Sequence, residues 1–187
     1  MRDAGEIFTV GHSTHPIEEF VGLLRDAEIE LVADVRRYPG SRRNPQFGAE
    51  ALARSLGEAC IHYEALGESL GGRRESAAGP APGPPDNSAW RNPSFRAYAD
   101  HMSSPEFAAG IEVLERIARA RRTAVMCAEA HPSSCHRRLI ADWLQVRGWS
   151  VVHLLPRGRR EPHSLTPEAV VEAGRLSYPA PQPSLGI

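Results

Sequence analysis

Short apolar runs alternate with amphipathic segments along the first 156 residues. The runs predict five strands, at residues 7–10, 31–35, 60–66, 124–127 and 151–155. Helical spacing of apolar residues, with start signals such as Ser104-Pro105-Glu106, predicts helices from Pro16, over 49–59, from Ser104 and over 132–147. This alternation predicts a three-layer α/β fold, a mostly parallel sheet of about five strands with helices on both faces.

Two segments interrupt the alternation. Residues 76–88 are almost wholly Pro, Gly, Ala and small polar residues, which bury too little apolar surface to offset the entropy of ordering. They predict a disordered, mobile insertion. Residues 157–187 predict a Pro-rich C-terminal tail, in which Thr166-Pro167-Glu168 can start a short helix through Val171. We therefore expect one α/β domain over residues 1–156, with the insertion inside it and the tail after it.

Charge and composition narrow the choice of partners. The chain has 22 basic and 23 acidic residues, so no global field attracts it to nucleic acid or anionic lipid. Every basic residue is arginine, which excludes a Schiff-base lysine and the P-loop lysine. The N-terminus lacks the pattern of a signal peptide, and no apolar run reaches the roughly 18 residues of a membrane span. We expect a cytoplasmic protein with no membrane partner, and hence no disulfide framework for Cys60, Cys127 and Cys135.

Polar residues gather where the predicted strands end. In a parallel sheet these ends meet at one edge, where ligands bind. We expect a single depression there, built from the ends of four strands. Six residues are candidates for catalysis: His12, Asp34, Glu129, Cys127, Cys135 and His136. Seven are candidates for substrate binding: Ser13, Arg36, Ser41, Arg42, Gly71, Gly72 and Arg137.

The cysteines and acid–base groups each have two interpretations. Cys135 falls in the first turn of the helix predicted from Pro132, close to Arg137, so we predict that it is the most acidic thiol. Cys127, at a strand end, suits an exposed nucleophile. The alternative is that both are small buried hydrophobic residues, as we expect for Cys60. His12, Asp34 and Glu129 suit acid–base chemistry, and Asp34 suits a structural pair with Arg36 equally well.

Clustered arginines indicate an anionic ligand, because guanidinium groups match phosphates and carboxylates. One hypothesis is an enzyme that acts on a small anionic or nucleotide-like substrate by thiol or His/carboxylate chemistry. The other is a non-catalytic module that binds nucleotide or nucleic-acid phosphates through its arginines. A metal site of Cys127, His131, Cys135 and His136 is a minority alternative, because their spacing matches no zinc motif. The sequence identifies no cofactor and no oligomeric state.

Four motifs together resemble a known family. They are TVGHS at 9–13; DVR at 34–36 with Pro39 and SRRNPQF at 41–47; LG at 66–67 with LGG at 70–72; and CAE at 127–129 with Pro132 and CHR at 135–137. Over residues 7–155 this combination resembles the bacterial family numbered 488 among the domains of unknown function. The resemblance implies a small cytoplasmic α/β protein and carries no reaction with it.

A second resemblance concerns architecture. The strand LVADVR at 31–36 resembles the early Asp-Val-Arg strand of rhodaneses, and Cys127 before a loop and helix resembles their active-site loop. Cysteine phosphatases, which share that loop, place an arginine six residues after the cysteine. Here that position is Ser133 and the next arginine is Arg137. Neither sulfur transfer nor phosphatase chemistry follows from this resemblance.

Overall fold

Six strands form one sheet in the order β3-β2-β4-β1-β5-β6 in the computed structural model, which describes residues 4–40, 43–74 and 85–181. The first five strands are parallel, and the last pairs antiparallel with β5. The predicted fold class is confirmed, with β6 as an additional edge strand. The strands are β1 (Glu6–Gly11), β2 (Leu31–Asp34), β3 (His62–Ala65), β4 (Thr123–Cys127), β5 (Ser150–Leu155) and β6 (Arg159–Pro162).

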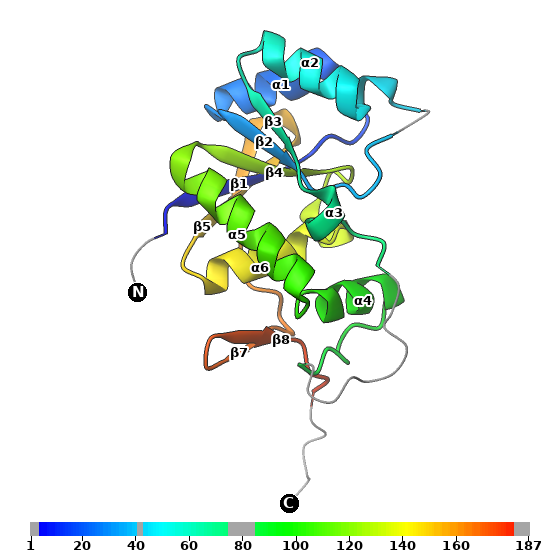
Figure 1. Cartoon of the computed structure of the whole chain (residues 1–187), viewed down its shortest axis with the longest axis vertical. Helices are drawn as coiled ribbons and strands as arrows, with labels where there is room; N and C mark the ends of the chain where they lie inside the picture. The colour runs from blue at the N-terminus through cyan, green and yellow to red at the C-terminus, as the bar shows by residue number, and fades with distance from the viewer. Residues whose placement is uncertain (1–3, 41–42, 75–84, 182–187) are drawn as a thin grey trace, which may run out of the picture.

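Helices cover both faces of the sheet (Figure 1). Helices α1 (Ile17–Asp26) and α2 (Ala49–Glu58) pack on one face, and α5 (Pro105–Ala120) and α6 (Arg137–Val146) pack on the other. The short helices α3 (Gly67–Leu70) and α4 (Pro93–His101), which were not predicted, lie toward the edge where the parallel strands end. In the described part of the chain, no helix has both the length and the apolar character needed to cross a membrane.

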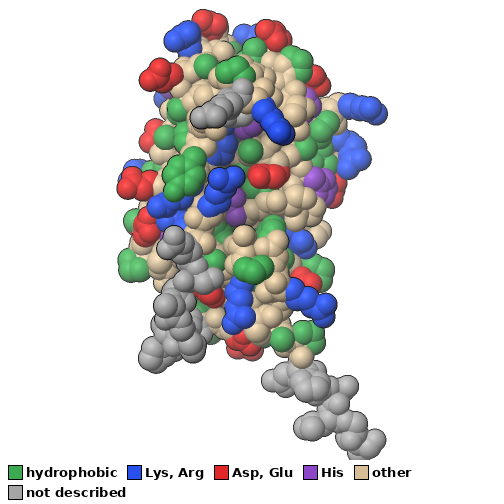
Figure 2. All heavy atoms as spheres, turned by 90° about the vertical axis from the view of Figure 1, so that its right-hand side faces the viewer, with side chains coloured by type: hydrophobic (Ala, Val, Ile, Leu, Met, Phe, Trp, Pro, Cys, Tyr) green, Lys and Arg blue, Asp and Glu red, His purple; other side chains and the backbone are tan. Residues whose placement is uncertain are grey.

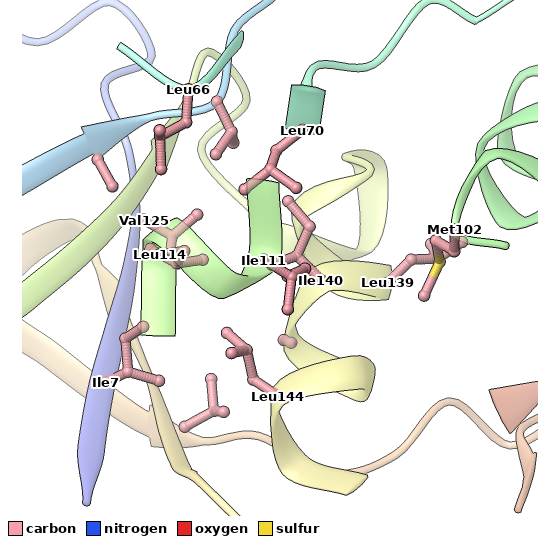
Figure 3. Close-up of a cluster of buried hydrophobic side chains, with 14 of the residues drawn as sticks. Ile7, Leu66, Leu70, Met102, Ile111, Leu114, Val125, Leu139, Ile140 and Leu144 are labelled. Atoms are coloured by element: carbon pink, nitrogen blue, oxygen red, sulfur yellow. The ribbon is translucent and has the colours of Figure 1, made fainter. Parts of the chain in front are cut away.

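Successive side chains of the central strands point to opposite faces of the sheet, so each strand contributes to two hydrophobic cores. Ile7 and Val125 belong to the core under α5 and α6, whereas their neighbours Phe8 and Met126 belong to the core under α1 and α2. Figure 3 shows Ile7 and Val125 on the sheet and Leu144 among the helical side chains of the first core. Burial on both faces explains why the strands are almost continuously apolar, which made them predictable.

The helix predicted over 132–147 begins only at Arg137. Residues Pro132–Ser134 form a 3₁₀ turn, η2, and Cys135 follows with an extended backbone (φ −139°, ψ 144°). The turn closes through a hydrogen bond from the Cys135 amide to the Pro132 carbonyl (3.0 Å). Cys135 therefore precedes the helix, and its predicted place in the first helical turn is wrong.

The segment predicted as a tail is built into the fold. Residues 159–162 form β6, and β7 (Val170–Glu172) pairs with β8 (Arg175–Ser177), where a short helix was expected. Thr166 cannot start that helix because its amide and hydroxyl both donate to the buried Asp142 carboxylate (2.9 and 2.6 Å). The predictions of a tail and of a helix there are wrong over these residues.

The predicted insertion at 76–88 is only partly described. Residues 75–84 lie outside the described residues, so their predicted mobility stays a prediction. Asn87 is buried, donates to Asp100 (2.9 Å) and accepts from the amide of Tyr178 (3.2 Å). The C-terminal end of the expected insertion is therefore fixed against the C-terminal segment.

Tyr178→Phe is expected to lower the free energy of unfolding by about 1–3 kcal/mol. The hydroxyl of Tyr178 donates to Asp142 (2.8 Å) in a fully buried position, so the substitution leaves the carboxylate with one hydrogen bond fewer. Urea denaturation measures the change. Tyr38→Phe is the control because Tyr38 is 67% exposed, and equal losses in the two variants would contradict the prediction.

Candidate functional site

A cleft opens where the parallel strands end. It consists of three adjoining depressions with volumes of about 380, 220 and 120 Å³, and Arg73 and Glu129 line all three. Figure 2 shows this side of the molecule, where basic, acidic and histidine side chains meet on one face. A separate depression of about 380 Å³ between α1 and Pro156–Gly158 contains none of the predicted site residues.

Asp34 and Arg36 form a closed pair at the end of β2. The Arg36 side chain donates to Asp34 through Nε (2.9 Å) and Nη2 (2.6 Å), and its amide donates to the same carboxylate (3.0 Å). The Tyr63 hydroxyl adds a further hydrogen bond to Asp34 (2.8 Å). Asp34 is 1% exposed and Arg36 is 8% exposed, so the pair is buried. This geometry favours the structural interpretation of Asp34.

His12 is held by the same network. Arg36 Nη1 donates to His12 Nε2 (3.1 Å) and to the Phe47 carbonyl (2.8 Å), while His12 Nδ1 donates to the Ser13 carbonyl (2.9 Å). Burial, together with the Arg36 guanidinium, lowers the pKa of His12 to about 4. Both ring nitrogens are engaged, so His12 and Arg36 position each other and leave little capacity for a substrate.

Cys127 and Cys135 meet at the bottom of the cleft. Cys127 ends β4, Cys135 follows η2, and the thiol of Cys135 donates to Cys127 Sγ at 2.6 Å. Both are buried free cysteines, so the expectation that Cys127 is exposed at its strand end is wrong. Burial and the neighbouring Cys127 raise the pKa of Cys135 well above its ordinary value. The prediction that Cys135 is the most acidic thiol is therefore wrong in its direction, because burial outweighs the charge of Arg137.

Arg137 is completely buried beside this pair. Its Nη1 donates to Cys127 Sγ (3.2 Å), Nη2 donates to the Ala130 carbonyl (3.2 Å), and its amide donates to Cys135 Sγ (3.4 Å). Its Nε has no hydrogen-bond partner in the part of the chain that the structure describes. We expected Arg137 to contact the substrate, but the structure directs it to the sulfur of Cys127.

His136 and Glu129 flank the two thiols. His136 Nε2 donates to the Val35 carbonyl (3.1 Å), and its Nδ1 lies 3.5 Å from Cys135 Sγ. Burial lowers the pKa of His136 to about 4, so the ring is neutral and Nδ1 carries a lone pair. Burial opposes the charged form of Glu129, yet the polar thiols of Cys135 and Cys127 beside its carboxyl lower the pKa of that carboxyl. The carboxylate is therefore ionised beside the thiols.

Three of these side chains can hold a metal ion. The ligand atoms of Cys127, Glu129 and Cys135 lie within 4.8 Å of one another. The set expected from the sequence differs, because His131 is exposed and its Nδ1 contacts the Ser133 hydroxyl (2.7 Å). Two thiolates and a carboxylate suit zinc, although the Arg137 guanidinium already occupies one side of Cys127.

Two glycines allow the close packing of the site. A Cβ on Gly11 would lie 1.8 Å from the Glu129 carbonyl oxygen, and one on Gly72 would lie 2.8 Å from His136 Nδ1. Gly72 also lines the cleft, whereas Gly71 is buried against Gly67 and Arg37. The expected close approach at Gly71 and Gly72 is present, but the approaching groups belong to the protein.

The remaining predictions concern the mouth of the cleft. Ser13 lines the largest depression, with its amide donating to the Ala128 carbonyl (2.9 Å). Ser41 and Arg42 lie outside the described residues. Arg37 and Tyr38, which were not singled out as site residues, line the cleft directly after the Asp34–Arg36 turn. Their only signal in the sequence is their adjacency to that motif.

Cys60 differs from Cys127 and Cys135 in its surroundings. It is exposed and has a left-handed backbone (φ 59°) in the turn between α2 and β3. A helix that must turn sharply into a strand brings this residue to the surface, so the expectation that Cys60 is buried is wrong.

The fold and the cleft define an α/β protein in which thiol and arginine side chains gather at the carboxyl edge of the sheet. The family model described as domain of unknown function DUF488 matches residues 16–144, and the chain belongs to this family. No curated protein and no solved structure matches the chain. These comparisons give no support to the rhodanese-like resemblance.

Proposed function

We propose that this protein is an enzyme that acts on a small anionic substrate through the sulfur of Cys127. The observation that carries the proposal is the contact between the buried Arg137 guanidinium and Cys127 Sγ (3.2 Å). Arginine stays charged in proteins, and a buried charge without a counter-ion is strongly unfavourable.

A thiolate at Cys127 is the natural counter-ion of Arg137. Within the described ranges, no carboxylate forms an ion pair with Arg137. In the resting structure the Cys127 thiol donates to the Glu129 carbonyl (3.8 Å). Its sulfur also accepts from Cys135, so two donors, Arg137 and Cys135, face the sulfur once that proton has left. A thiolate is the nucleophilic form of cysteine, and it is stabilised by such donors.

The mouth of the cleft supports an anionic substrate. Arg73 is exposed and, within the described residues, forms no ion pair. Arg37 lines the same depression while donating to the Glu68 carbonyl (3.0 Å). Tyr38 is 67% exposed at this rim and offers a ring for stacking, which suits a nucleotide-like substrate. A cytoplasmic location, where thiols stay reduced, belongs to this proposal.

The alternatives account for less of the site. His/carboxylate chemistry would need His12 and Asp34, but their polar atoms are engaged by Arg36, by the Ser13 carbonyl and by the Tyr63 hydroxyl. A module that only binds nucleotide or nucleic-acid phosphates would use Arg37 and Arg73 at the mouth, and it gives no reason for a buried arginine on a cysteine sulfur.

Alkylation of the reduced protein tests the proposal. Iodoacetate at pH 6.5 is expected to modify Cys127 at least about tenfold faster than Cys60, because an ordinary thiol is only about 1% ionised at that pH. Peptide mapping by mass spectrometry measures both rates in one sample, with the exposed Cys60 as the internal reference. Arg137→Met is expected to remove the advantage, and Arg121→Met, at the exposed end of α5, is expected to preserve it.

Two results would reject the proposal. One is modification of Cys60 alone at every pH below 8. The other is an unchanged Cys127 rate in Arg137→Met protein that remains folded by circular dichroism. The phosphate-binding module would then be the better explanation of the exposed arginines.

A further inference from the structure

We infer that Cys127 and Cys135 are a dithiol pair that closes to an intramolecular disulfide as it reduces a substrate, and that this substrate is a small disulfide bearing acidic groups. This inference rests on the proposed function, because Cys127 is again the attacking sulfur. It adds a role for Cys135, a role for His136 and the class of substrate.

The two sulfurs are held together by the main chain around them. Cys127 is the last residue of β4, and its carbonyl accepts from the His12 amide (3.0 Å). The loop that follows is fixed at Ala128 by the Ser13 amide and at Ala130 by Arg137. The sulfurs lie 2.6 Å apart, and a disulfide bond of about 2.05 Å requires only a small further approach.

The side chains that contact Cys127 and Cys135 give the two thiols different chemical roles. Cys127 receives the Arg137 guanidinium, which stabilises a thiolate. Cys135 carries a proton that it donates to Cys127, and its sulfur lies 3.5 Å from His136 Nδ1. His136 is oriented by its bond to the Val35 carbonyl, so its free lone pair faces Cys135. The pair therefore consists of an attacking sulfur and a resolving sulfur with its own proton acceptor.

The exchange balances in two steps. The Cys127 thiolate attacks a disulfide R–S–S–R, forms the mixed disulfide Cys127–S–S–R and releases RS⁻. Cys135 then attacks Cys127 Sγ while its proton passes by way of His136 Nδ1 to the departing second RS⁻, so the internal disulfide forms as the mixed disulfide breaks. The first departing thiolate takes up the proton that Cys127 lost on becoming a thiolate, and the second takes up the Cys135 proton. The two cysteines lose two electrons, and the substrate gains them.

The cleft indicates what kind of disulfide is accepted. Cys127 lines the 220 Å³ depression together with Arg37 and Arg73, and Cys135 lines the adjoining 120 Å³ depression. This space exceeds what a peroxide needs, and its cations suit carboxylates on the substrate. Disulfides with charged groups fit both features.

Oxidised glutathione is the probe for the test, applied to the otherwise complete Cys60→Ser protein so that only the pair can react. The expected product contains a Cys127–Cys135 disulfide and no bound glutathione, with two reduced glutathione molecules released per chain. Cys135→Ser in the same background is expected to stop at a mixed disulfide on Cys127 and to release one. Cys127→Ser is expected to form neither product.

Arg73→Ala separates charge recognition from the exchange itself. It is expected to slow oxidation by oxidised glutathione about tenfold. Oxidation by the neutral bis(2-hydroxyethyl) disulfide should slow much less, so the ratio of the two rates should fall. Equal slowing with both probes, or with neither, would overturn the assignment of an acidic substrate.

The outcomes distinguish this inference from the proposed function. If Cys127 reacts rapidly with iodoacetate but glutathione stays attached in the protein with both cysteines, the dithiol inference fails and the proposed function stands. If the purified protein carries one zinc per chain and both thiols resist alkylation, the Cys127–Glu129–Cys135 cluster is a metal site, and both fail. The product map of the Cys60→Ser protein decides between these results without changing either cysteine.

Discussion

Asp34→Ala is expected to lower the free energy of unfolding by about 3–5 kcal/mol, because it leaves the buried Arg36 guanidinium without its counter-ion. The carboxylate accepts from three Arg36 donors and from Tyr63, so the substitution also leaves these groups unsatisfied. Urea denaturation followed by circular dichroism measures the change.

Glu161→Ala is the matched control for this loss. Glu161 pairs with Arg159 on β6, where the two side chains are 51% and 71% exposed, and such a pair contributes less than about 1 kcal/mol. Comparable losses in the two variants would show that the Asp34 pair contributes no more than a surface pair.

Acidification is expected to unfold the protein in a window that begins near pH 6.5. Burial lowers the pKa of His153 to about 3, and burial lowers the pKa values of His12 and His136 to about 4. Below pH 6.5 the unfolded chain therefore binds protons that the folded chain does not, and stability falls with falling pH. By pH 4.5 each of these histidines costs roughly 2–3 kcal/mol, which together approach the whole stability of a typical domain.

The slope of stability against pH identifies the histidines responsible. Each one contributes up to about 1.4 kcal/mol per pH unit within the window. His153→Gln is expected to reduce the slope between pH 6.5 and 4.5 by that amount, and the exposed His62→Gln is expected to leave it unchanged. Urea denaturation at several pH values gives the slope. A free energy of unfolding that stays constant from pH 7.5 to 4.5 would contradict the prediction.

The parts of the fold that could be predicted are those fixed by local patterns. The five parallel strands and helices α1, α2 and α5 follow from apolar periodicity and start signals that lie within each element. Helix α5 shows this directly, since Ser104 accepts from the Phe107 amide (3.1 Å) as a helix N-cap should. The gathering of polar residues at one sheet edge followed from the parallel arrangement alone.

The parts that could not be predicted depend on partners distant in sequence. Thr166 and His163 are fixed by Asp142 on α6, and His163 in turn contacts His153 (3.0 Å) on β5. The sequence pattern of the Pro-rich segment gives no signal for these contacts. In the same way, the sequence allows two roles for Asp34, and only the folded structure shows that hydrogen bonds from Arg36 and Tyr63 occupy its carboxylate. The burial that raises the pKa of Cys135 is also a property of the assembled core.

The residues that match the family model are fewer than the residues that the sheet needs in order to fold. Excision at residues 16 and 144 would keep β2, β3 and β4 but remove β1 and β5, and β1 lies between β4 and β5. Such a fragment would present the open edge of β4, a template for pairing with other chains, and it would also lose His12. Domain swaps or chimeras made with this family therefore need to carry the flanking strands, from Glu6 to at least Leu155, as one inseparable block.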